Sequence, residues 1–186
     1  MVDERSIDRL AKSGADVISV HLPAASAGTY RAIMQIDGFG DCLKNIQRLV
    51  ERRDATTLVV PTFTKLQANL AEMEPWYDHW LRVLGCAVIV GPSDFSGSIG
   101  DVSAARMEPP QRRACARIQS RMTILCDGRI VSCEQDFLGK QVLGQIGMDS
   151  IQSVWSGSLA KLRKDHGSGN WQTHAVCAAC SDWHRP

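Results

Sequence analysis

The chain has 186 residues, of which 44% are hydrophobic and 22% are charged, and its formal net charge is +1. This composition is that of a folded protein with a real core, so it excludes a disordered chain and allows one medium domain or two small ones. The charge is too small to attract nucleic acid or an acidic membrane, and we expect neither as a partner.

The cysteine count and the first residues of the chain indicate a reducing compartment. Seven cysteines are present, an odd number that would leave one thiol unpaired in a disulfide-bonded secreted protein. Residues 1–5 are charged where a signal peptide would need an apolar segment, and no stretch has the roughly 18 to 20 apolar residues that span a bilayer. We therefore expect a cytoplasmic protein with no membrane role.

The first 91 residues alternate between helical and strand-like patterns. Apolar residues at helical spacing predict helical segments over 3–13, 29–33, 39–53 and 65–84. We expect the last of these to be kinked at Pro75. Short β-branched and apolar runs predict strands over 16–22, 56–63 and 86–90. Near-continuous apolar strands that alternate with helices are typical of a parallel sheet, so we predict an α/β domain with about three parallel strands and helices outside.

A polar segment follows this domain. It contains Gly91-Pro92-Ser93, Ser96-Gly97-Ser98 and Glu108-Pro109-Pro110, and it is longer than most loops inside a compact domain. We therefore predict a first domain over 1–91, a connector over 92–112 and a second, cysteine-rich α+β domain over 113–186.

Four cysteines of the second domain have a spacing typical of a metal site. Cys115 and Cys133 flank a predicted β-hairpin whose turn contains Asp127-Gly128, and Cys177 and Cys180 form a Cys-x2-Cys pair. Four thiolates can hold a 4Fe-4S cluster or a tetrahedral zinc ion. The spacing leaves both possibilities open, together with that of unligated thiols.

Several other residues are weaker candidates for this site. Cys126, beside the hairpin turn, could substitute as a ligand, and His174 and His184 flank the Cys-x2-Cys pair but are more typical of surface or second-shell groups. Cys42 and Cys86 lie in apolar patterns and are predicted core residues.

Charged residues surround the predicted ligands. Glu134 and Asp136 follow Cys133, so either carboxylate could accept a proton from a substrate bound there, although a surface or hairpin-stabilising role is the simpler interpretation. A basic run near Cys115 could favour the reduced state of an anionic cluster or contact an acidic substrate or a nucleic acid phosphate, and its simplest interpretation is a solvated face. The run consists of Arg106, Arg112, Arg113, Arg117 and Arg121.

Two short helices are predicted over 149–155 and 158–166, and their apolar residues could pack over the metal site. Three tryptophans of the same region are expected to shield it from water. They are Trp155, Trp171 and Trp183.

The residues of the second domain carry a family resemblance. The run from Cys115 to Cys133, then Leu143-Gly144, Ser153-Val154-Trp155 and Cys177-Ala-Ala-Cys180, resembles the C-terminal SPASM module of radical SAM enzymes, which binds auxiliary 4Fe-4S clusters. Residues 18–22 and the helices and strand that follow resemble the second half of the radical SAM partial (β/α) barrel. The resemblance implies that Ser19 and Asn69 lie on the side of the barrel that approaches S-adenosylmethionine.

Two departures from the family pattern shape the expected function. The Cys-x3-Cys-x2-Cys loop of the family's catalytic cluster is absent, which implies the C-terminal portion of a longer enzyme that binds S-adenosylmethionine only when the N-terminal half is supplied. The pattern also stops at Cys180, as in the one-cluster form of the module called twitch.

Three functions follow as hypotheses, and whether this chain is itself an enzyme stays open. In the first, the auxiliary cluster transfers an electron or anchors a peptide or small-molecule substrate. In the second, the chain is a non-catalytic iron-sulfur subunit, completed in trans by a protein with the N-terminal half barrel. In the third, it is a zinc-stabilised binding module in which Arg112, Arg113 and Arg117 contact an acidic partner.

Overall fold

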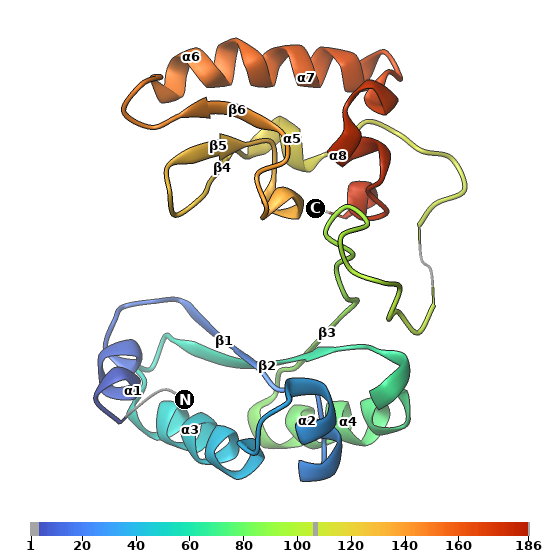
Figure 1. Cartoon of the computed structure of the whole chain (residues 1–186). Coiled ribbons are helices and arrows are strands. Elements are labelled where there is room, and N and C mark those ends of the chain that lie inside the picture. The colour runs from blue at the N-terminus through green and yellow to red at the C-terminus, as the bar shows by residue number, and fades with distance from the viewer. Residues whose placement is uncertain (1–3, 106–107, 186) are drawn as a thin grey trace. The chain divides into compact units, whose positions relative to one another are not determined.

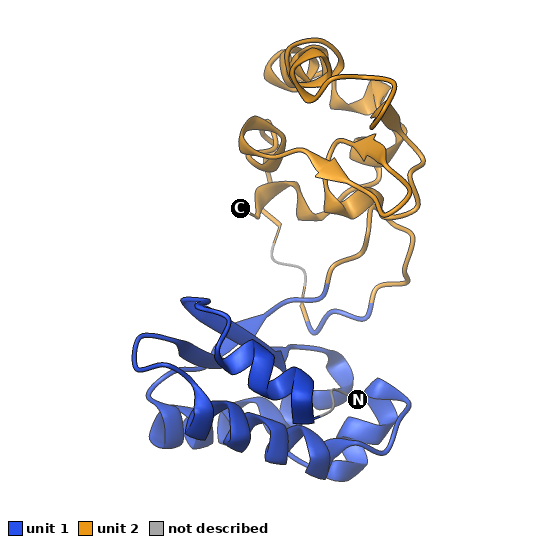
Figure 2. Cartoon of the chain, turned by 90° about the vertical axis from the view of Figure 1, so that its left-hand side faces the viewer, with its two compact units in different colours: residues 1–92, 102–104 blue, residues 93–101, 105–186 orange. Residues whose placement is uncertain are grey.

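The structure is a computed structural model that describes residues 4–105 and 108–185. It divides into two compact units, unit 1 with Met1–Pro92 and Val102–Ala104, and unit 2 with Ser93–Asp101 and Ala105–Pro186 (Figure 2). The segment expected as a connector is therefore shared between the units. Within unit 1, Ser103 forms a β-bridge with Leu66.

Unit 1 contains a parallel three-stranded sheet in the order β1-β2-β3 (Figure 1). Its strands are β1 (Val17–His21), β2 (Leu58–Thr64) and β3 (Val88–Val90). In the register, Ile18 lies opposite Val59, and Phe63 lies opposite Ile89. The α/β class and the parallel strands are confirmed, whereas three strands form an open sheet, so the barrel half stays a prediction.

The helices of unit 1 cover one face of this sheet (Figure 1). They are α1 (Glu4–Ala11), α2 (Ala27–Met34), α3 (Phe39–Arg52), the 3-10 helix η1 (Gln67–Glu72) and α4 (Met73–Leu84). Alternate strand residues such as Ile18, Val59 and Phe63 point into this core, where Phe63 contacts Trp76 with ring centroids 5.0 Å apart.

The opposite face of the sheet carries the side chains that alternate with the core residues along each strand. Val17, Leu58 and Val88 are 55%, 51% and 42% exposed, so the strands are not buried on both faces within unit 1, as their apolar runs suggested. Toward the carboxyl ends of the strands this face is polar, with the Ser19 and Thr62 hydroxyls 2.7 Å apart. His21 Nε2 lies 2.9 Å from the Thr64 hydroxyl in the same row, and burial lowers the pKa of His21.

The kink predicted at Pro75 is wrong. The helical segment changes from 3-10 to α geometry between Glu72 and Met73, so Pro75 falls in the first turn of α4. A proline is accommodated there because the amides of the first turn have no partner within the helix.

Unit 2 contains an antiparallel sheet in the order β4-β5-β6 with short helices around it (Figure 1). The strands are β4 (Thr123–Ile124), β5 (Arg129–Val131) and β6 (Val142–Gln145). The helices are α5 (Arg117–Ser120), η2 (Glu134–Asp136), α6 (Ile151–Ser156), α7 (Ser158–Gly167), η3 (Trp171–Thr173), α8 (Ala175–Ala178) and η4 (Asp182–His184). The predicted hairpin and the two predicted helices are present, and β6 is an additional strand.

The hairpin turns where its sequence indicated. The Leu125 amide donates to the Arg129 carbonyl at 2.8 Å, which closes the loop around Asp127 and Gly128. Gly128 has a φ of +84°, in the left-handed region that glycine adopts without a steric penalty. The turn thereby directs β5, and the Cys133 that follows it, back along β4.

A carboxylate at the end of η1 caps α2. Glu72 accepts hydrogen bonds from the Ala25 amide at 2.6 Å and from the Ser26 and Thr29 hydroxyls at 2.6 and 2.7 Å. Burial raises the pKa of Glu72, but these hydrogen bonds outweigh it, and the net pKa lies below the usual 4.5. A lowered folded-state pKa stabilises the fold above the unfolded-state pKa, and this contribution is lost as the pH falls through the folded-state value.

We predict that Glu72→Gln lowers the free energy of unfolding by about 1–2 kcal/mol at pH 7, because the charged acceptor of three hydrogen bonds is lost. The difference from the wild type should shrink as the pH falls below about 4.5. Urea unfolding at several pH values measures it. The control is Glu74→Gln, at an exposed carboxylate in the same turn, and an equal loss there would contradict the prediction.

The Leu-Gly pair of the module has a packing reason. A side chain at Gly144, in β6, would place its Cβ 2.5 Å from Val154 Cγ2 and 3.1 Å from Asp149 Oδ2, so only glycine allows α6 to pack this closely. We predict that Gly144→Ala lowers the free energy of unfolding by about 1–3 kcal/mol through overpacking. Thermal unfolding checks this against Gly167→Ala in α7, which has open space around the added methyl and should be neutral.

Candidate metal centre

Separate segments of unit 2 each supply part of a group of four cysteines. Cys115 precedes α5, Cys133 follows β5, Cys177 lies in α8 and Cys180 comes just after α8. The first three are 6–7% exposed, and Cys180 is half-buried. Cys115 and Cys177 belong to one apolar cluster with Ile118, Leu159, Leu162 and Trp183.

Burial raises the pKa of three of these thiols, and the charges of neighbouring cysteines add to the rise. Burial, followed by the charges of Cys133, Cys180 and Cys115, raises the pKa of Cys177 to about 12, with the positive charge of Arg112 opposing the rise. Burial also raises the pKa of Cys180 to about 11 and, above all other causes, raises that of Cys133. Because metals bind thiolates, ligation at this site must release protons.

Backbone amides favour the thiolate form of two of the cysteines. The Gln135 amide lowers the pKa of Cys133 and the Asp182 amide lowers that of Cys180, each against the larger effect of burial. Hydrogen bonds to sulfur orient ligands and adjust the potential of an iron-sulfur centre. These amides follow each cysteine by two residues, so the chain turns sharply around both ligands.

Two buried N–H donors beside the cysteines lack a partner among the described residues, namely Arg112 Nε and His166 Nε2. The Cys115 amide donates to His166 Nδ1 at 3.4 Å, so the imidazole proton lies on Nε2. A buried donor without a partner costs about 1–3 kcal/mol. An anionic group held by the cysteines would satisfy both donors, so the residues present fit such a group.

The thiols do not converge on a single point. Within residues 4–105 and 108–185, no three His, Cys, Asp or Glu side chains are grouped closely enough to hold one metal ion.

The structure separates the four cysteines from the other three. Cys126 is exposed at the hairpin turn. Cys42 packs against the core of unit 1, and the half-buried Cys86 thiol lies 3.5 Å from the Val59 carbonyl.

Both nearby histidines have partners of their own. His174 Nδ1 accepts a hydrogen bond from Gln141 Nε2 at 2.9 Å, and its Nε2 lies 2.9 Å from Asp165 Oδ2. His184 Nδ1 donates to the Ser181 carbonyl at 3.1 Å. These contacts give the two histidines structural roles beside the cysteines.

The two carboxylates proposed as proton acceptors are also engaged. Glu134 Oε1 lies 3.3 Å from Arg117 and 3.8 Å from Arg121. Asp136 is 2% exposed, and its two oxygens accept the Lys140 and Gln141 amides at 2.8 Å each. Asp136 thus fixes the turn that leads to β6.

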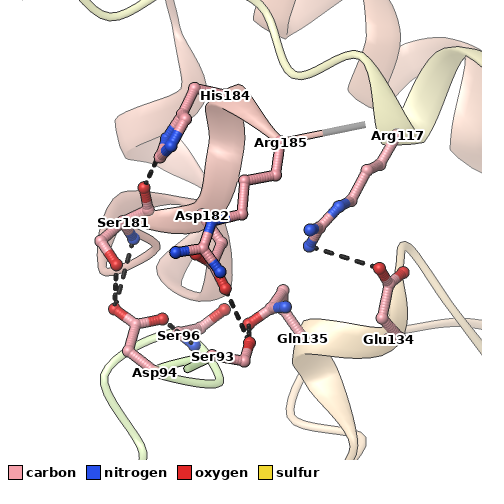
Figure 3. Close-up of polar contacts among 10 residues, drawn as sticks. All are labelled: Ser93, Asp94, Ser96, Arg117, Glu134, Gln135, Ser181, Asp182, His184 and Arg185. Carbon is pink, nitrogen blue, oxygen red and sulfur yellow. Dashed lines mark hydrogen bonds and ion pairs between the residues drawn. The ribbon is translucent and has the colours of Figure 1, made fainter. Parts of the chain in front are cut away.

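A network of polar side chains holds the residues that follow Cys133 and Cys180 (Figure 3). We call it the polar bracket, and its members are Ser93, Asp94, Gln135, Ser181 and Asp182. The Ser93 hydroxyl lies 2.7 Å from both Gln135 Oε1 and Asp182 Oδ2, and donates its single proton to one of them. Asp94 Oδ2 accepts the Ser181 hydroxyl at 2.7 Å. The bracket therefore fixes the chain just after Cys133 and just after Cys180.

The basic run is only partly a solvated face. Arg117 is 7% exposed and pairs with Glu134, and Arg112 donates to the carbonyls of Cys177 and Cys180. Arg113 is exposed. Arg106 lies outside the described residues.

In unit 1, the structure shows the contacts of Ser19 and Asn69, the two residues expected near S-adenosylmethionine. The Asn69 side chain is 1% exposed, accepts the Leu66 amide and donates to the Pro23 and Thr64 carbonyls. Its amide is fully used to tie η1 to the ends of β1 and β2. Ser19, in contrast, stays on the open face of the sheet.

Sequence reasoning missed the polar bracket and His166. Leu159, Leu162 and His166 recur at helical spacing in α7, so the sequence does contain a signal that His166 faces the core. The bracket has no such signal, because Ser93 and Asp94 come from a polar segment far from the cysteines in the chain.

Comparisons with known proteins relate the segment that contains the four cysteines to an iron-sulfur domain. Residues 115–181 match the family model of SPASM, an iron-sulfur cluster-binding domain. The chain is 25% identical over 128 residues to an uncharacterized protein of Treponema pallidum (strain Nichols), in a match that covers 67% of this chain and 34% of that protein. The crystal structure of BtrN in complex with AdoMet and 2-DOIA matches with a TM-score of 0.46 and 20% identity, over 74% of this chain and 55% of BtrN.

The family match spans all four predicted ligands. It confirms the resemblance of the second domain to a SPASM module, and with it an iron-sulfur cluster as the group that such a module binds. The chain spans about a third of the Treponema protein and about half of BtrN.

In the described residues, no helix has the length and apolar character needed to cross a membrane.

We predict that the buried Asp136 matters to stability and the half-exposed Glu134 does not. Asp136→Ala should lower the free energy of unfolding by about 2–3 kcal/mol, because the Lys140 and Gln141 amides lose their acceptor. Glu134→Gln should cost less than about 1 kcal/mol, because Glu134 is half-exposed and the glutamine oxygen can still accept from Arg117. Urea unfolding of both variants checks this, and the reverse order would show that the Asp136 hydrogen bonds are not needed.

Proposed function

We propose that unit 2 binds one auxiliary 4Fe-4S cluster through Cys115, Cys133, Cys177 and Cys180. The observation that carries the proposal is the gathering of four interacting, largely buried thiols inside the segment that matches the SPASM domain. The unpaired donors of Arg112 and His166 support an anionic group at this place. The match of residues 115–181 to an iron-sulfur cluster-binding domain favours a cluster over a zinc ion.

The residues of the chain define how the site would work. The four thiolates would hold the group, and the Gln135 and Asp182 amides would favour the thiolate forms of Cys133 and Cys180. The apolar cluster around Leu159, Leu162 and Trp183 excludes water. A bound cluster supplies one-electron transfer at a potential set by burial and by hydrogen bonds to sulfur.

The wider role we propose is that of the C-terminal portion of a radical SAM enzyme, in which this cluster transfers an electron or anchors a peptide or small-molecule substrate. The Cys-x3-Cys-x2-Cys loop that binds the catalytic cluster is absent from the sequence, so this chain should not cleave S-adenosylmethionine by itself. The open face of the sheet, with Ser19 and His21 in its polar row, supports a barrel wall that the N-terminal half would complete. A complementing chain in the same reducing cytoplasm is the alternative source of that half.

We predict that the chain, purified anaerobically with iron and sulfide supplied, contains about four irons and four sulfides per molecule. The double variant Cys177→Ala, Cys180→Ala should lose nearly all of both, because half of the ligands are gone. Iron, sulfide and zinc analysis measures the content, and the thiolate-to-iron absorption band gives a second readout.

The matched control is Cys126→Ala, which removes an exposed thiol of the same unit and should keep the full cluster. Bound zinc without sulfide in the wild type would contradict the proposal and favour a structural module. Loss of the cluster in the Cys126 variant would show that the ligand set is wrong.

A further inference from the structure

Arg112 is held against the Cys177–Cys180 turn from several sides. Its guanidinium donates to the Cys177 carbonyl and, at 3.4 Å, to the Cys180 carbonyl. The same group lies over two indole rings, 5.3 Å from the Trp171 centroid and 5.9 Å from that of Trp183. A guanidinium packed between aromatic faces and tied to two carbonyls has little freedom to move.

The charge of Arg112 has no carboxylate among the partners described for it, in contrast to its neighbours. Arg117 and Arg121 both pair with Glu134, so that pair of charges is balanced in part by an anion of the chain. The partners of Arg112 are carbonyls and aromatic rings, which are neutral. Arg113, the next residue, is exposed and its charge is screened by water.

One donor of Arg112 is still to be accounted for. Its Nε is buried and has no hydrogen-bond partner among the described residues, although the side chain lies against the turn that carries two of the four cysteines. Such a buried, charged donor calls for an acceptor of negative charge. The group that the neighbouring thiolates bind is the anion at hand.

We propose that Arg112 is a positioning residue of the iron-sulfur site, which clamps the Cys177–Cys180 turn and, by its half-buried positive charge, raises the reduction potential of the bound cluster. The inference rests on the proposed function, since it needs a cluster. Its physical basis is that reduction adds negative charge to an anionic group, and a fixed cation in a medium of low dielectric constant stabilises the reduced state more than the oxidised one. The clamp keeps the cation at a constant distance from the ligands.

The test compares reduction potentials, measured by an EPR-monitored redox titration, for cluster-loaded wild type, Arg112→Met, Arg112→Lys and Arg113→Met. Arg112→Met should shift the potential to more negative values, because the half-buried charge is removed. Arg112→Lys should restore most of the potential by retaining the charge. Arg113→Met is the matched control, with the same change one residue away on the exposed surface, and should leave the potential unchanged.

Release of iron to a chelator tests the clamp in variants that are folded by circular dichroism. A lysine ammonium lacks the planar, preorganised fork with which the guanidinium holds two carbonyls, so Arg112→Lys should release iron several-fold faster than the wild type and Arg113→Met at the wild-type rate. If Arg112→Met does not retain the cluster, the iron-release rates of Arg112→Lys and Arg113→Met test whether Arg112 holds the Cys177–Cys180 turn. Equal release rates for wild type and Arg112→Lys would overturn it.

The outcomes separate this inference from the proposed function. A wild type without iron and sulfide would overturn the proposed function and, with it, the inference. A loaded wild type whose potential is matched by Arg112→Met, or shifted equally by Arg113→Met, would overturn only the assigned charge effect of Arg112.

Discussion

The burial of thiols next to N–H donors that lack an acceptor is the constraint on which unit 2 depends. Cys177 lies in an apolar cluster, and beside the cysteines Arg112 Nε and His166 Nε2 have no acceptor in the described chain. Packing of this kind is unfavourable unless another group completes it, because each unpaired donor costs free energy and the thiols resist ionisation. The iron-sulfur cluster that we propose would bind the thiolates and add an anionic acceptor beside these donors.

The four cysteines are held in place by different interactions. The β-hairpin fixes the position of Cys133, His166 accepts the amide of Cys115, and Arg112 grips the turn that carries Cys177 and Cys180. The polar bracket then joins the residues after Cys133 to those after Cys180. A site assembled this way is preorganised by hydrogen bonds from outside the ligand shell, which is how proteins orient metal ligands and adjust their properties.

Unit 1 shows the same division between structural and open polar groups. The side chains of Asn69 and Glu72 hydrogen-bond to the backbone of the loops at the ends of the strands, so they hold these loops in place. Ser19, His21 and their threonine partners remain on the open face of the sheet. This polar row lies outside the apolar core of unit 1.

The local elements could be predicted from the sequence because they depend on near neighbours. Helical spacing, apolar strands and the Asp127-Gly128 turn indicated most elements and the parallel sheet, and the cysteine spacing indicated the four-ligand module. Pro75 was misjudged, since its effect depends on where the helix starts. The match over 115–181 confirms the module and leaves the assignment of each ligand as a prediction.

Only the tertiary structure decided which polar residues serve the fold. The sequence by itself determined the strands, the hairpin and the cysteine module, because each is encoded by local spacing. It could not show that Asp136 binds two amides, that Arg117 pairs with Glu134 or that Arg112 binds the Cys177–Cys180 turn. The physical reason is that these contacts, and the burial that gives them their strength, arise only when segments far apart in the chain come together.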